Sequence, residues 1–297
     1  MKAKHSVMGV AAHCDDVEFL FGGILLKYHD VFDYEVVYVQ STNNMSGEWT
    51  VTNGFPPLPE GDYKRELCPR PNAAYHVYHV PYFIEMPQRK KESQTVAEKF
   101  FGTDAVFLDY PQRHYFDKDL RKIELCYGAP RPDCVPENMP SIMTAHDHPE
   151  EVEKVASLIL EKNPEVIITH APVDYTEEHT ATSHLMRKAF LAAKKRGYDG
   201  SLIFAPPLTP RTYGELFERF DVFVDISGFE EKKRFMIGHH NTQVPYPERL
   251  DLEDLPRGAK CGVKAAELFY NFEISSSREG TLTDELRNNY EKVRSLF

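Results

Sequence analysis

A histidine, a cysteine and two aspartates stand directly after an apolar run near the start of the sequence. In the stretch 10–19, "VAAHCDDVEF", these residues are His13, Cys14, Asp15 and Asp16. Imidazole and carboxylate groups are good ligands for a divalent metal such as zinc, and a catalytic zinc takes three protein ligands and keeps one position for water. The stretch therefore offers part of a metal site. A capped loop at the start of a helix is the alternative interpretation.

A second polar cluster follows a later apolar run. The stretch "EVIITHAPVDYTEEHTATSH" contains His170, Asp174, Glu177, Glu178, His179 and His184. A structural role is again open, because Thr176 suits a helix N-cap and acidic residues in a first turn are favoured by the helix dipole. Since parallel strands bring their carboxyl ends to the same edge of a sheet, two such clusters after two strands predict one shared site.

The elements that must hold both clusters are a parallel sheet and its connecting helices. Short apolar or β-branched runs predict strands at residues 6–13, 34–42, 105–111 and 165–170. Helical spacing of apolar residues predicts helices at 17–30, at 89–102, from Pro149 onward, and at 177–197. This alternation predicts an α/β fold with a Rossmann-like, mostly parallel, doubly wound sheet and helices on both faces.

Two stretches fit this alternation poorly. Residues 50–88 and 110–145 are rich in proline and tyrosine, and they predict long loop excursions over the active face that shape a pocket. With 297 residues, of which 41% are hydrophobic, the chain is expected to form a single domain over residues 1–297 that includes these excursions.

The composition argues against several classes of partner. The chain has 46 acidic and 35 basic residues, and a formal net charge of −11 disfavours binding to nucleic-acid phosphates or anionic lipid. The N-terminal apolar stretch is too short for a signal-peptide core or a membrane span. The five cysteines are scattered without a C-x-x-C pair, so reduced thiols and a cytoplasmic location are expected.

The motifs resemble those of the PIG-L/LmbE-type metal-dependent de-N-acetylases. The first motif of that family reads A-H-P-D-D-E and the second roughly P-x-D-x-H-P-D-H-x-A-T, and this sequence has "AHCDDVE" and "PVDYTEEHTAT". Further similarity lies in "RKKESQTVAEKFFGTDAVFLDYP", "FMIGHHNTQ" and "GVKAAELF". The similar segments follow the family order along most of the chain.

The resemblance implies a zinc-dependent hydrolase that removes an N-acetyl or related acyl group from an amino sugar or glycoconjugate. It assigns His13, Asp16 and His179 as ligands of Zn²⁺ or another divalent metal. Asp15 is implied as the general base that takes a proton from the attacking water, and His240 as the acid that protonates the leaving amine.

Three positions depart from the family pattern. Thr176 stands where the family has the first histidine of H-P-D-H, and Glu178 replaces the aspartate. A threonine hydroxyl can donate a hydrogen bond to an oxyanion but cannot carry positive charge. Cys14 replaces the family proline, and inert packing, oxidation and metal ligation all stay open for it. Other candidates for the acid are His239, His170 and Tyr175.

Substrate-binding candidates lie near these motifs. By resemblance, Glu48 and Arg89 hold substrate hydroxyls. Trp49 is a candidate for stacking on a sugar ring, although aromatic residues of an excursion also form its own core, and Tyr175 completes the set. The expected partner is a small N-acyl sugar or glycoconjugate, with no nucleic acid and no membrane span, and a homo-oligomer stays open.

Two other functions stay open beside the hydrolase. Thr176 and Glu178 are compatible with a catalytically impaired homologue that binds metal or sugar without turnover. A metal-dependent amidase that acts on a non-sugar conjugate is the other. A panel of substrates distinguishes this amidase from the hydrolase of N-acyl sugars, whereas metal content does not, because both bind a metal.

Overall fold

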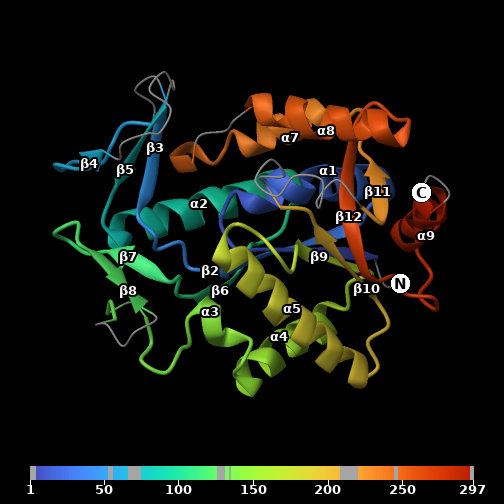
Figure 1. Ribbon diagram of the computed structural model, residues 1–297, viewed down its shortest axis with the longest axis horizontal. Helices are drawn as coiled ribbons and strands as arrows, with labels where there is room; N and C mark the ends of the chain where they lie inside the picture. Colours follow the sequence, from blue (N-terminus) through green and yellow to red (C-terminus); the bar gives the residue numbers. More distant parts are fainter. Residues whose placement is uncertain are drawn as a thin grey trace.

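A seven-stranded sheet forms the centre of the molecule in the computed structural model, which describes residues 5–52, 56–65, 75–125, 131–133, 135–207, 220–243 and 247–294 (Figure 1). The strand order is β11-β12-β10-β9-β1-β2-β6. These strands are, in chain order, β1 (Ser6–Ala11), β2 (Glu35–Thr42), β6 (Val106–Tyr110), β9 (Val166–His170), β10 (Ser201–Ala205), β11 (Val222–Asp225) and β12 (Ala266–Glu273).

The sheet is parallel except at one edge. Strand β1 lies between β2 and β9 and is parallel to both, and β2–β6 and β9–β10 are also parallel pairs. Strand β12 is antiparallel to β10 and to the edge strand β11. The predicted α/β fold with a mostly parallel sheet is confirmed, and the antiparallel edge is an addition that strand–helix alternation did not indicate.

Helices cover both faces of this sheet and connect its strands. The helices are α1 (Asp16–Phe32), α2 (Tyr82–Phe101), α3 (Ile142–Ala145), α4 (Pro149–Lys162), α5 (Glu177–Lys195), α7 (Glu230–Ile237), α8 (Pro247–Cys261) and α9 (Thr281–Arg294), with a short 3₁₀ turn η3 (Asn241–Gln243). Within the part of the chain that the structure describes, no helix combines the length and apolar composition needed to span a membrane.

Strand β1 is buried on both faces, as its continuous apolar sequence predicts. Val7 and Ala11 pack into a core that contains α1, α2 and α9, whereas Met8 and Val10 pack into a second core with α3, α4 and α5. Successive side chains of a strand point to opposite faces, so a central parallel strand needs apolar residues at every position. The two cores hold the carboxyl end of β1 in a fixed place.

The helix boundaries follow local signals. Pro149 opens α4, and Gly102 ends α2 with a φ of 61°, a left-handed conformation that suits glycine. Helix α2 begins at Tyr82, seven residues before the predicted start at 89, and contains Pro87 in its first turns. Pro87 is the sixth residue of this helix, and because proline has no N–H it removes the hydrogen bond that position 87 would donate to the carbonyl of Phe83.

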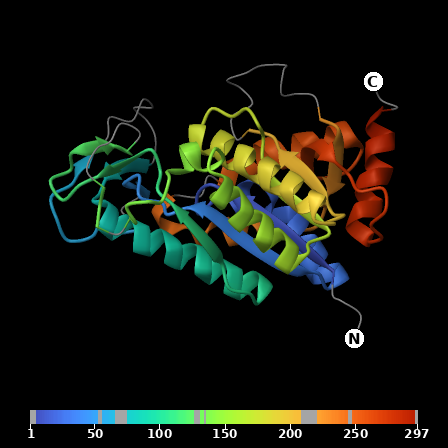
Figure 2. The ribbon, with the colours of Figure 1, turned by 90° about the horizontal axis from the view of Figure 1, so that it is seen from below.

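The two predicted excursions contain regular structure at one end of the molecule (Figures 1 and 2). The first holds a three-stranded antiparallel sheet of order β3-β5-β4, made of β3 (Glu48–Thr52), β5 (Tyr75–His79) and β4 (Lys64–Arg65). The second holds the hairpin of β7 (His114–Phe116) with β8 (Lys122–Glu124), followed by α3. The description of both stretches as loops is therefore corrected, because their aromatic and β-branched residues pair across strands.

Candidate metal centre

The three predicted metal ligands meet at the carboxyl ends of β1 and β9. His13 follows β1, Asp16 opens α1, and His179 lies in the first turn of α5. Nδ1 of His13 and Nε2 of His179 each lie 3.1 Å from Oδ2 of Asp16, and the two nitrogens are 3.2 Å apart. A tetrahedral zinc with bonds of about 2.0 Å separates its ligand atoms by about 3.3 Å, so this donor set fits zinc.

The site is buried and negatively charged. Asp16 and His179 are each 3% exposed. Burial works against both charged forms, but the neighbouring histidines hold the pKa of Asp16 well below its usual range, and the carboxylates of Asp16 and Asp174 raise the pKa of His179 to about 10. Carboxylates placed in this way also favour a divalent cation.

Two residues outside the ligand set orient His179. Oδ2 of Asp174 lies 3.2 Å from its Nδ1, which leaves Nε2 directed at the other ligands. The ring of His170 stacks on His179 with centroids 4.0 Å apart. The backbone N–H of Ala12 donates to Nε2 of His170 at 2.8 Å, and burial lowers the pKa of His170 to about 3. Because this nitrogen accepts a hydrogen bond, it carries no proton for a leaving amine.

Asp15, the predicted base, occupies the N-cap position of α1, and its side chain is 19% exposed. Nη2 of Arg89 lies 3.7 Å from its Oδ1. The same guanidinium donates from Nη1 to Glu85 at 3.1 Å and from Nε to Sγ of Cys14 at 2.8 Å. Arg89 is only 3% exposed, so the structure places it against the base, and its binding to substrate hydroxyls stays a prediction.

Cys14 lies behind the ligand set. Its side chain is fully buried, and burial raises the pKa of its thiol. Ligand atoms of Cys14, Glu92 and His240 lie within 4.8 Å of one another. Arg89 already donates to the sulfur, and both oxygens of Glu92 accept hydrogen bonds from Thr242. Hydrogen bonds within the protein therefore account for the closeness of Cys14, Glu92 and His240, and no second metal is needed to explain it.

His240 pairs with the first turn of α1. It is 1% exposed, and its Nε2 lies 3.1 Å from Oε2 of Glu18. Although burial opposes the charged ring, Glu18 raises the pKa of His240 well above its usual value. The hydroxyl of Tyr38 donates to the other oxygen of Glu18 at 2.9 Å. This network fixes Glu18, and the proton-donor role of His240 stays a prediction.

The loop between β9 and α5 carries two of the other predicted residues. Thr176 is the N-cap residue of α5, but its side chain makes no capping hydrogen bond, and its N–H donates to Asp174 at 2.9 Å. Tyr175 is 69% exposed. Nearby, Arg113 forms an ion pair with Glu177 at 2.6 Å and lies 3.5 Å from Glu178. Thr176 therefore keeps a hydroxyl that its helix does not use.

The remaining candidates are on β3. Glu48 is exposed, and its backbone carbonyl accepts a hydrogen bond from Gln243 at 3.0 Å. Trp49 is paired in register with Tyr78 of β5 and is only 7% exposed. A ring so covered offers little face to a sugar, and its stacking role stays a prediction. Sequence reasoning did not assign roles to Glu18 and Glu85, which contact the predicted site residues His240 and Arg89.

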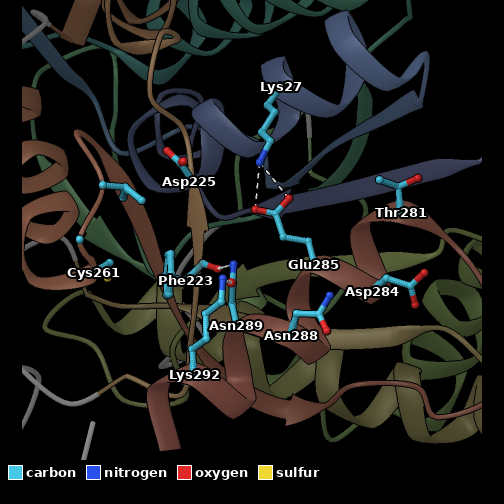
Figure 3. A pocket seen from close by; sticks show the side chains of 12 residues that line it. Lys27, Phe223, Asp225, Cys261, Thr281, Asp284, Glu285, Asn288, Asn289 and Lys292 are labelled. Carbon is cyan, nitrogen blue, oxygen red and sulfur yellow. Dashed lines mark hydrogen bonds and ion pairs between the residues drawn. The ribbon is translucent and has the colours of Figure 1, made fainter. Parts of the chain in front are cut away.

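A separate hollow lies between the end of α1, β11 and α9 (Figure 3). Within it, Nζ of Lys27 donates to both carboxylate oxygens of Glu285, at 2.9 and 2.8 Å. None of the site residues predicted from the sequence is among the residues described as lining it. Lys27 and Glu285 neutralise each other, and the hollow is not part of the metal centre.

Comparison with known proteins gives a consistent picture. The model of the PIG-L family, GlcNAc-PI de-N-acetylase, matches residues 8–190. No curated protein is significantly similar to the chain. Among solved structures, the N,N'-diacetylchitobiose deacetylase of Pyrococcus horikoshii is 17% identical with a TM-score of 0.58, and the alignment covers 93% of this chain and 88% of that one.

Two further structures share the fold. GalB, a 4-carboxy-2-hydroxymuconate hydratase from Pseudomonas putida, is 17% identical with a TM-score of 0.59, and 94% of this chain aligns with 100% of that one. The zinc-inhibited form of the teicoplanin deacetylase Orf2 is 15% identical with a TM-score of 0.54, covering 89% and 97% of the two chains. Because a hydratase shares the fold with deacetylases, the fold alone does not set the reaction.

Proposed function

The chain belongs to the PIG-L family of GlcNAc-PI de-N-acetylases, and we propose that it is a zinc-dependent hydrolase that removes an N-acetyl or related acyl group from an amino sugar or glycoconjugate. The observation that carries the proposal is the meeting of His13, Asp16 and His179 within 3.2 Å, and Asp15, next to Asp16 in the chain, offers a further carboxylate. Three ligands and a neighbouring base are what metal-assisted amide hydrolysis requires.

The metal ion supplies two effects when it is bound at these three residues: it polarises the acyl carbonyl, and it lowers the pKa of a water to about 7. Asp15 takes the proton of the attacking water. Its side chain is 19% exposed and reaches solvent, whereas Asp16 is 3% exposed and points at the histidines. Adjacent aspartates thus divide the two roles.

The proton must then reach the leaving amine. We propose that the protonated Asp15 supplies this proton in place of His240, the donor expected from the family resemblance, because His240 is 1% exposed and its ring pairs with Glu18. One carboxyl group acting first as base and then as acid satisfies the proton balance of amide hydrolysis. The guanidinium of Arg89, 3.7 Å away, limits the orientations available to the Asp15 carboxylate.

Thr176 is the donor proposed for the developing oxyanion. Its hydroxyl makes no cap to α5, so it is available to a substrate, and Tyr175 next to it is 69% exposed. A neutral hydroxyl stabilises an oxyanion by a hydrogen bond only, and loss of one such donor typically lowers kcat by roughly 10²–10³-fold. A threonine at this position therefore predicts a slower enzyme than one with a charged histidine.

The substrate class rests on the relatives. One similar structure is a deacetylase of N,N'-diacetylchitobiose, and others are teicoplanin and A40926 pseudoaglycone deacetylases. These names describe an acyl group on an amino sugar, either free or within a glycopeptide. The same linkage is proposed for the substrate of this chain.

The test combines metal content with amine release. Purified protein is reconstituted with zinc, its metal is measured by elemental analysis, and primary amine is measured after incubation with N-acetylated sugars, glycoconjugates and non-sugar amides. About one metal per chain with amine released from the sugars supports the proposal. Amine released only from non-sugar amides supports a different amidase, and a chain that takes up no metal contradicts the metal centre.

A second candidate is a metal- and sugar-binding protein without turnover, and the observation that favours it is Thr176 in place of an ionisable residue. It predicts bound metal and saturable sugar binding with no amine release. Calorimetric titration with the same sugars distinguishes it from an enzyme whose substrate is absent from the panel.

A further inference from the structure

Helix α1 is broken one turn after the metal site. Phe21 has φ −147° and ψ 21°, outside the helical region, so the first segment, which carries Asp16 and Glu18, is separate in direction from the rest of the helix. The break starts a new helix whose first N–H groups have no partner within the helix. These groups are buried, and a buried N–H needs an acceptor.

Glu267 of β12 supplies that acceptor. Its Oε1 accepts from the N–H of Gly23 and its Oε2 from the N–H of Ile24, both at 2.8 Å. Glu267 is 0% exposed. It reaches α1 from a strand that lies far from this helix along the chain. A carboxylate on two N–H groups at a helix N-terminus is the favoured arrangement for both charge and hydrogen bonding.

A buried lysine balances the charge of this carboxylate. Nζ of Lys233 donates to Oε1 of Glu267 and to Oδ2 of Asp254, each at 2.7 Å, and these side chains are at most 3% exposed. Lys233 belongs to α7, and the segment after α7 carries His240, which contacts Glu18. The same part of the chain therefore touches both halves of α1.

Small residues allow this close contact. A Cβ on Gly23 would lie 2.9 Å from Oε1 of Glu267 and 2.7 Å from Cδ1 of Ile226, and a Cβ on Gly22 would lie 2.6 Å from Cε of Met236. Gly23 has no room for a side chain, whereas at Gly22 the end of the Met236 side chain would have to move. The pair "GG" after the metal motif is thus explained by the approach of β12 and α7 to the broken helix.

We propose that Glu267 is a positioning residue of the metal centre: by holding the N-terminus of the second half of α1, it sets the direction of the first turn that presents Asp16 to His13 and His179. The inference rests on the proposed metal site. It adds to that site a determinant of ligand geometry that lies on β12, outside both metal motifs. Outer contacts that orient ligands change metal affinity by roughly 10–100-fold.

The test compares Glu267→Gln with a matched control, Glu165→Gln. Glu165 is also 0% exposed and also accepts from a helix N-terminus, the N–H of Thr283 in α9 at 2.7 Å, as well as from Tyr34 at 2.7 Å. It precedes β9, at the end of that strand opposite His170. Both substitutions remove a buried negative charge that caps a helix, but only one adjoins α1 at its break.

Cobalt and zinc are titrated into the metal-free forms of the full chain, with thermal unfolding recorded for each. We expect Glu267→Gln to bind both metals roughly 10–100-fold more weakly and to change the cobalt d–d spectrum, with Glu165→Gln unchanged in both. If Glu267→Gln does not fold, Glu267→Asp replaces it, since a side chain shorter by one methylene retains the charge toward Lys233 but not both N–H contacts.

Three results overturn the inference, and they are distinguishable. Metal affinity and spectrum equal to those of the unmodified chain mean that Glu267 only stabilises the fold. Equal losses in the Glu267 and Glu165 variants mean that metal binding follows overall stability. If the unmodified chain binds no metal, the metal centre itself is wrong, and the positioning role falls with it.

Discussion

Nδ1 of His13 lies 3.2 Å from Nε2 of His179, although 166 residues separate them in the chain. The contact exists because β1 and β9 are adjacent parallel strands, paired from Val7 with Val166 to Gly9 with Ile168. Their carboxyl ends deliver one histidine directly and the other through the start of α5. The candidate metal centre therefore depends on the parallel pairing, since His13 and Asp16 follow the end of β1 and His179 follows the end of β9.

Replacement of either histidine is expected to abolish tight metal binding. His13→Ala or His179→Ala leaves two of three protein ligands, and the affinity is expected to fall by more than about 100-fold, because changes outside the ligand set already cost roughly 10–100-fold. Elemental analysis after dialysis measures the remaining metal. His146→Ala is the control, since His146 contacts His184 and Asp147 on another part of the chain. Normal metal content in either ligand variant refutes the assignment.

Asp15→Asn is expected to retain the metal and lose turnover. The amide cannot accept the proton of the attacking water, so kcat is expected to fall by roughly 10²–10⁴-fold, the usual contribution of a general base. Turnover of an N-acetyl sugar and metal content are measured on the same preparation. Asp147→Asn, at an exposed position paired with Lys188, serves as the control. Unchanged kcat excludes Asp15 as the base, and lost metal reassigns it as a ligand.

Cys14→Ala is expected to leave metal content unchanged. The Sγ atom of Cys14 accepts a hydrogen bond from Nε of Arg89, and burial raises the pKa of the thiol, which disfavours the thiolate that a metal needs. Of the three roles left open from the sequence, inert packing is the one that these contacts favour. Metal content of the variant decides the question, because a drop to near zero identifies Cys14 as a fourth ligand.

The mostly parallel sheet could be predicted from the sequence because it depends on local patterns, whereas the ligand set came from the family resemblance and stays a prediction. His13 and Asp16 follow an apolar strand within five residues, and His179 opens a strongly amphipathic helix, so strand ends and helix starts could be located from periodicity. The family resemblance then paired the two motifs. At these strand ends and helix starts, the preferences of the local sequence agree with the fold.

Contacts between residues far apart in the sequence could not be predicted from local patterns. Arg89 is a charged residue on a predicted helix, and only the fold shows that its guanidinium is buried against Asp15 and Cys14. The position of Glu267 beside Gly23 depends on the antiparallel strand β12, which strand–helix alternation does not predict. The strands between residues 48 and 79 were missed because prolines and tyrosines there suggested loops, whereas pairing of β3 with β5 is set by tertiary context.

The unfolding free energy of the metal-free protein is expected to fall as the pH decreases from about 6.5 to about 4, in part because of His114. This histidine is 8% exposed, and burial, with Lys122 nearby, lowers its pKa to about 4. Between these values the unfolded chain binds a proton at His114 that the folded chain does not, so stability is lost as the pH falls through the window, by at most about 3 kcal/mol. Urea unfolding at several pH values measures the loss.

The comparison with His114→Gln isolates this residue from other buried histidines such as His170. The glutamine keeps a polar side chain of similar size but does not titrate, so the stability of the variant is expected to depend less steeply on pH over the same window, with the difference assignable to His114. His148→Gln is the control, because His148 lies in an exposed part of the chain, at the start of α4. Parallel curves for the unmodified chain and His114→Gln show that His114 binds its proton equally in the folded and unfolded states, which requires Glu178 and Glu124 to offset burial and Lys122.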